Sequence, residues 1–154
     1  MTYEDLLTDA DHAGLLVKEQ NLLEYDGLIK GDRIAIRETI PTQVAKACVL
    51  AEELGHHYTS SGIIIDQTST SNRKQERRAR IWAYKKAFAL TDLILAFKAG
   101  CRNRYEFAEY LEITEAFLQE AIDYYKEKYG PYIIQEPYVI YLDPLGVLEL
   151  LRKE

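Results

Sequence analysis

The chain has 154 residues, which is enough for one domain with a hydrophobic core of its own. Its formal net charge of −6 argues against a protein that binds nucleic acid by neutralising phosphates. The two cysteines, Cys48 and Cys101, follow no disulfide or metal spacing and predict reduced thiols. The first residues are acidic, and no apolar run reaches the length of a membrane span, so we expect a cytoplasmic protein that is neither secreted nor membrane-bound.

The first part of the chain predicts one short helix and several short strands. Thr2 is placed to cap a helix that follows it. Residues 13–17 are apolar and fit either a strand or a continuation of that helix. Residues 26–37 predict a β-hairpin, because apolar and polar residues alternate after a short turn. Further along, residues 62–66 predict a turn and a short buried strand.

Two longer helices are predicted in the middle of the chain. The first begins near Pro41, with Thr39 or Thr42 as its cap. Residues 67–72 are rich in serine and threonine and predict a polar loop. The second helix runs from about residue 73 to 89, and its arginines and lysines make it basic; such a face is usually solvated, although an acidic partner could bind it.

The last third predicts short helices and one strand. Thr91 is placed to cap a short helix. Residues 105–118 predict two helices joined by a tight corner, with Thr114 capping the second, a pattern that resembles a helix-turn-helix unit. Residues 138–142 predict a strand and residues 145–151 a short terminal helix.

Acidic and imidazole side chains crowd together in the first long helix, between Leu50 and Tyr58. Glu52 and His56 are four residues apart and therefore share a helix face. The sequence from Glu52 to His56 matches the zinc-protease motif H-E-x-x-H, except that its first histidine is a glutamate. A carboxylate can bind zinc, so Glu52 and His56 are candidate metal ligands. Glu53 is the candidate general base.

A metallopeptidase needs a third protein ligand, and Glu76 in the second long helix is the candidate. The small residues Ala79 and Ala83 follow it and would let the two helices approach closely. The alternatives are that Glu76 only pairs with Arg80 one turn on, and that His56 is a hydrogen-bonded core residue. His57 either donates a hydrogen bond to a neighbouring carboxylate or stabilises an oxyanion, or else it is a surface residue.

These residues give the chain a resemblance to a known family. Residues 34–37, 50–57 and 74–83 are together similar to the ImmA/IrrE family of metallopeptidases, in particular its phage and mobile-element branch. The last segment resembles the family's E-x-x-A-x-x-[FW]-A sequence, whose glutamate is the third zinc ligand. The resemblance implies that Glu53 is the base and that His56 and Glu76 are ligands. Glu52 stands where the family usually has a histidine.

The resemblance and the patterns lead to one set of expectations. We expect an α+β fold with a small antiparallel sheet packed on a zincin-like active-site helix, followed by a mainly helical half. Residues 1–130 would form the metallopeptidase domain, including the helix-turn-helix-like pair at 103–128, and residues 131–154 a strand and tail packed on it. By resemblance, the activity is metal-dependent endopeptidase cleavage of a phage or prophage repressor or another transcriptional regulator.

The glutamate at the first ligand position alters the expected metal chemistry. Two carboxylates and one imidazole leave a divalent ion less positive than two imidazoles and one carboxylate would, so bound water is acidified less. Oxygen ligands also weaken the preference for zinc over manganese. We therefore expect Zn, or Mn, held less tightly than in relatives with a full motif, so that a crystal can be metal-free. One alternative function is a weak or inactive protease scaffold that binds a regulator. The other, direct DNA binding by the helical pair, is disfavoured by its acidic second helix.

Overall fold

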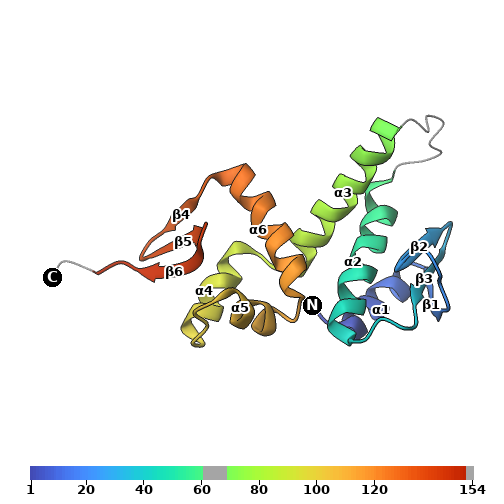
Figure 1. Ribbon diagram of the computed structural model, residues 1–154, viewed down its shortest axis with the longest axis horizontal. Coiled ribbons are helices and arrows are strands. Elements are labelled where there is room, and N and C mark those ends of the chain that lie inside the picture. The colour runs from blue at the N-terminus through green and yellow to red at the C-terminus, as the bar shows by residue number, and fades with distance from the viewer. Residues whose placement is uncertain (61–68, 152–154) are drawn as a thin grey trace. The chain divides into compact units, whose positions relative to one another are not determined.

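The computed structural model describes residues 1–60 and 69–151 of the chain (Figure 1). The chain forms two compact units, Met1–Ala87 and Phe88–Glu154. Helices are combined with two small three-stranded sheets, so the predicted mixture of helices and strands is confirmed. The units divide after Ala87, within the span of residues 1–130 that was expected to form the metallopeptidase domain. The strand predicted at residues 62–66 lies outside the described residues.

The first unit contains a three-stranded sheet and three helices. Its elements are α1 (Tyr3–His12), β1 (Leu16–Gln20), β2 (Gly27–Lys30), β3 (Arg33–Arg37), α2 (Gln43–Thr59) and α3 (Ser69–Ala87). The predicted hairpin is confirmed, because β2 and β3 are antiparallel and Gly31 occupies their turn with a φ of 61°. The sheet is not purely antiparallel as expected, since β1 pairs parallel to β3 and leaves β2 at the edge, in the order β1-β3-β2.

Helix α2 is the central element of the first unit, because it packs against the sheet on one side and against α3 on the other (Figure 1). Ile34 and Ile36 point from β3 toward this core and are buried. Leu50 and Leu54 of α2 are fully buried as well. Because residues alternate along a strand, Arg33, Ala35 and Arg37 of β3 face outward.

The ends of the two long helices differ in part from their predictions. Thr42 caps α2, since its hydroxyl accepts a hydrogen bond of 3.0 Å from the backbone N–H of Ala45. Pro41 therefore lies before the cap rather than in the first turn. Helix α3 begins at Ser69, so the loop predicted at residues 67–72 is wrong over its described part. Once the later turns of α3 pack on α2, each residue added at the start of α3 gains a backbone hydrogen bond. This gain outweighs the weak helix propensity of serine and threonine.

The second unit consists of helices followed by an antiparallel sheet. Its elements are α4 (Leu90–Lys98), α5 (Arg104–Leu111), α6 (Glu115–Tyr129), β4 (Tyr132–Gln135), β5 (Tyr138–Leu142) and β6 (Leu145–Glu149). The prediction of a terminal helix is wrong, because residues 145–149 form a strand that pairs with β5. A short, mainly apolar run is compatible with either structure, and here pairing with β5 makes it a strand.

Capping explains the helices of the second unit. The predicted pair of helices is confirmed as α5 and α6, and the Thr114 hydroxyl accepts from the N–H of Phe117 at 3.1 Å. Thr91 is not a cap, because α4 begins one residue earlier and the Asp92 carboxylate accepts from the N–H of Ala89 at 2.8 Å.

Phe107 is the largest fully buried side chain. Among the described residues, none of the helices combines the length and apolar character that crossing a membrane requires.

Candidate functional site

The candidate site depends on a very close approach of α2 and α3 at Gly55. A Cβ atom built on Gly55 would lie only 2.2 Å from the carbonyl oxygen of Ala79, which is far inside van der Waals contact. Ala79 and Ala83 are fully buried, so small residues line this contact on both helices. Only glycine fits at position 55, because it has no side chain. The contact determines which residues of the two helices meet.

The close approach brings His56 and Glu76 together. His56 follows Gly55 on α2, and Glu76 lies one turn before Ala79 on α3. The His56 Nε2 atom lies 3.2 Å from the Glu76 Oε1 atom, and their side chains are 20% and 53% exposed. This distance suits a hydrogen bond. It is also close to the roughly 3.3 Å that separates two ligand atoms bound tetrahedrally to one zinc ion at about 2.0–2.1 Å.

Glu53 lies against strand β2. A Cβ atom built on Gly27 would lie 2.9 Å from Glu53 Oε1 and 2.7 Å from Val49 Cγ1, so this strand runs directly over the carboxylate. Burial, with smaller contributions from the negative charges of Glu52 and Glu76, raises the pKa of Glu53 from 4.5 to about 7. A carboxyl with this pKa can either hold or accept a proton near neutral pH.

Glu52 is half-buried and lies one helical turn before His56. Its negative charge is one cause of the raised pKa of Glu53, so the two carboxylates interact. We call Glu52, Glu53, His56 and Glu76 the carboxylate–histidine cluster. The chemistry of its donors, one imidazole and several carboxylates, suits a divalent ion. His56 and Glu76 are spaced as two ligands of one ion would be, but the described residues contain no group of three His, Cys, Asp or Glu side chains arranged to hold a metal.

His57 faces an aromatic group. Its ring meets the edge of the Tyr58 ring at a centroid distance of 4.8 Å. The Tyr58 ring stacks on Trp82 of α3 at 5.1 Å, so this group also joins the two helices. The predicted role of His57, bonding to a carboxylate or an oxyanion, stays a prediction.

Sequence reasoning missed the part that Gly27 plays at this site. The glycine was interpreted only as part of the hairpin, although a glycine at a strand position often marks the close approach of another group. Here that group is Glu53. The position of the glycine at the start of β2 was therefore a usable signal.

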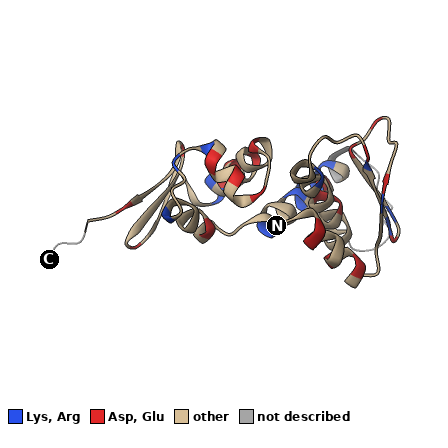
Figure 2. Ribbon diagram, turned by 90° about the horizontal axis from the view of Figure 1, so that it is seen from below, with Lys and Arg blue, Asp and Glu red and all other residues tan. Residues whose placement is uncertain are grey.

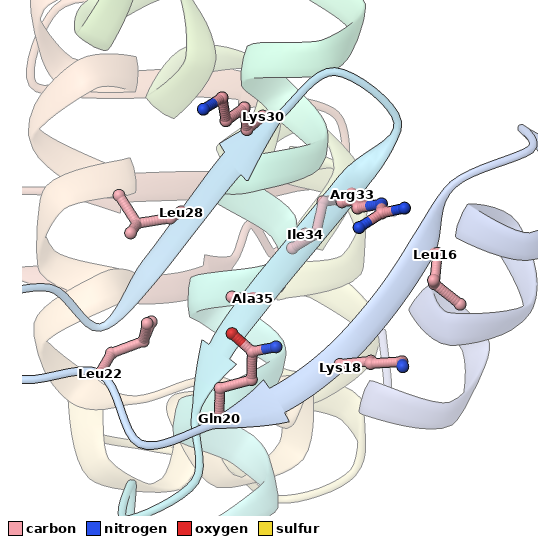
Figure 3. A pocket seen from close by; sticks show the side chains of 9 residues that line it. All are labelled: Leu16, Lys18, Gln20, Leu22, Leu28, Lys30, Arg33, Ile34 and Ala35. Atoms are coloured by element: carbon pink, nitrogen blue, oxygen red, sulfur yellow. The ribbon is translucent and has the colours of Figure 1, made fainter.

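A hollow of about 340 Å³ lies on the outer face of the sheet (Figure 3). Leu28 and Lys30 line it from β2, and they alternate with Gly27 and Ile29 along this strand. Because alternate residues point to opposite faces, this hollow is separated from Glu53 by the sheet itself. It does not belong to the carboxylate–histidine cluster.

The charges of the chain are mixed, with acidic and basic residues in both units (Figure 2). A comparison with protein-family profiles, curated proteins and solved structures returned no match. The family resemblance therefore stays a prediction that depends on the three sequence segments described above.

Proposed function

We propose that the first unit is a metal-dependent endopeptidase of the zincin type, with the carboxylate–histidine cluster as its active site. The observation that carries the proposal is the placement of Glu53. Its carboxyl has a pKa of about 7 and lies under strand β2, and Glu53 is three residues before His56, which contacts Glu76. A proton acceptor beside a possible ligand pair is the arrangement that metal-assisted hydrolysis needs.

Glu52, His56 and Glu76 are the residues that would hold the ion in this proposal, which is zinc or manganese. Two of them already lie within 3.2 Å of each other, and Glu52 is one turn from His56 on the same helix face. When bound, a divalent cation would supply a Lewis acid that polarises a carbonyl oxygen and acidifies a water molecule.

Glu53 is the proton-transfer group of the proposed reaction. It takes a proton from the attacking water and later gives it to the leaving amine. Strand β2 is at the edge of its sheet, so an extended peptide could pair with its free side. Since Gly27 of β2 lies against Glu53, such a peptide would run close to this carboxyl.

The proposed substrate is a repressor or another transcriptional regulator of a phage or mobile element, which acts in the cytoplasm. This part of the proposal is supported by the resemblance to the ImmA/IrrE family. It also agrees with the two buried free cysteines, which suit a reducing compartment.

A peptide library prepared from a digested bacterial proteome tests the activity without knowledge of the substrate. The protein is incubated with the library in zinc, in manganese or in a chelator, and new peptide termini are counted by mass spectrometry. We expect termini that appear only with a divalent ion and are lost in Glu53→Gln. The matched control is Glu24→Gln, which removes the same charge from an exposed loop residue of the same unit. Termini that persist in Glu53→Gln would exclude this mechanism.

The donor set supports a second candidate function. Glu52 replaces an imidazole by a carboxylate, and this change weakens both the affinity for zinc and the acidification of water. The alternative is a protein that binds a regulator at the same cluster without cleaving it. A stable complex with an intact regulator, in every metal tested, would favour this candidate over the peptidase.

A further inference from the structure

Three arginines form an exposed stripe along α3, which the proposed reaction does not use. Arg73, Arg77 and Arg80 are exposed and line a hollow of about 250 Å³ together with Ile81 and Tyr84. Tyr84 is buried, with 6% of its surface exposed, so it forms the floor of the hollow. We call the three arginines the arginine stripe.

The arginine stripe concentrates positive charge at helical spacing. Arg73 and Arg77 are four residues apart, and Arg77 and Arg80 are three apart, so their guanidinium groups are neighbours and repel one another. Within the described part of the chain, no ion pair involves Arg73 or Arg80. An anion bound between the guanidinium groups would reduce this repulsion.

The residue type indicates which anion fits. All three positions are arginine, whereas the exposed face of α3 that carries Lys74 and Lys85 has a single arginine, Arg78. The planar guanidinium group donates two parallel hydrogen bonds to a carboxylate or phosphate, which an ammonium group cannot do. The stripe therefore suits carboxylates or phosphates, whose oxygens accept directed hydrogen bonds, more than a negative charge that accepts none.

The arginine stripe lies beside the carboxylate–histidine cluster. Glu76 is three residues after Arg73 and four before Arg80, so it borders the stripe on the same helix, and its carboxylate reaches His56. From Arg73 to Arg80 the helix rises roughly 10 Å, since each residue adds about 1.5 Å. That length matches about three residues of an extended peptide.

We propose that the arginine stripe binds an acidic segment, rich in aspartate and glutamate, of the protein that the neighbouring cluster cleaves. The inference rests on the proposed function for the identity of this partner. A nucleic acid fits less well, because its evenly spaced phosphates would continue past the stripe and meet the carboxylates of the cluster. A peptide can present acidic residues to the arginines and neutral residues to Glu52, Glu53 and Glu76.

Binding of a labelled acidic peptide tests the inference directly. The probe is a fluorescein-labelled peptide of alternating glutamate and glycine, and its anisotropy is followed at low and high salt. The protein carries Glu53→Gln, so that no cleavage can occur during the titration. The test variant replaces Arg73, Arg77 and Arg80 by glutamine. Its matched control replaces Lys74, Arg78 and Lys85 by glutamine. These substitutions remove the same amount of charge from another exposed face of the same helix.

We expect the stripe variant to lose about tenfold in affinity and the control to lose less than about threefold, since three exposed ion pairs each contribute modestly. Equal losses in both variants would overturn the inference, because they would reflect net charge alone. A single-stranded oligonucleotide that binds the stripe more tightly than the peptide would also overturn it.

A lysine variant of the three arginines keeps the charge and removes the planar donors. We expect it to lose about threefold in affinity, and it replaces the glutamine variant if that one does not fold. Unchanged affinity in the lysine variant would overturn the assignment to arginine geometry. Because the titration needs no cleavage, its failure counts against the docking surface alone. The absence of Glu53-dependent termini in the peptide library counts against the proposed activity alone.

Discussion

Replacing Glu53 with glutamine should stabilise the metal-free first unit at alkaline pH and leave it nearly unchanged at acidic pH. The wild-type carboxyl has its pKa raised by folding from 4.5 to about 7. It therefore binds its proton more tightly in the folded state than in the unfolded state. The stability that this protonated carboxyl contributes is fully present below about pH 4.5 and falls as the pH rises toward 7. Above the pKa of about 7 the contribution has been lost and no longer changes with pH.

The size of the effect follows from the difference between the two pKa values. A difference of about 2.5 pH units corresponds to roughly 3 kcal/mol at most, since each unit is worth about 1.36 kcal/mol. Glutamine has nearly the same shape and carries no charge, so it fits under Gly27 without this cost. Part of the shift comes from the charges of Glu52 and Glu76, so added salt should reduce the difference.

Fluorescence of Trp82 measures this effect in the first unit. The chain has a single tryptophan, and its ring stacks on Tyr58 between α2 and α3, so its emission reports this contact. Urea unfolding is followed in a chelator from pH 4 to 8 for wild type, Glu53→Gln and the exposed control Glu24→Gln. A stability gain in Glu53→Gln that does not grow between pH 4.5 and 7, or an equal gain in Glu24→Gln, would refute the reasoning.

Three further predictions concern packing and capping. Gly55→Ala should destabilise the first unit by about 2–4 kcal/mol in urea unfolding, because the new methyl group meets the backbone of Ala79 rather than a flexible side chain; Gly146→Ala, where nothing lies within 4 Å, should change stability little. Phe107→Ala should cost the second unit about 3–5 kcal/mol by leaving a cavity, measured by loss of circular dichroism in urea, and a cost below about 1 kcal/mol would contradict its full burial. Thr114→Ala should cost about 1 kcal/mol in the same assay, while Thr114→Ser should restore most of it, since serine keeps the capping oxygen.

Several features of the fold were predicted correctly because their signals are local. Thr42 and Thr114 cap helices through their own hydroxyls and backbone groups three residues on. The hairpin of β2 and β3 follows from alternating side chains around a glycine turn. In each case the residues that make the contact lie within a few positions of one another. The sequence therefore contains the whole interaction.

The errors lie where a neighbour distant in the chain decides the structure. Residues 145–149 are a strand because β5 offers a paired edge, and β1 joins β3 in a parallel pair that no local pattern encodes. The start of α3 at Ser69 reflects packing of its later turns on α2. Short apolar or polar runs have weak preferences of their own, so the partner element determines their state.

The candidate site divides in the same way. The spacing of Glu52, Glu53 and His56 on one helix could be read from the sequence, because helix geometry alone relates them. The meeting of His56 with Glu76 needed the contact between Gly55 and Ala79, and the raised pKa of Glu53 needed a strand to cover its carboxylate. Side-chain types and their intervals are properties of the chain, whereas burial and distances between helices arise only when separate elements exclude water from one another.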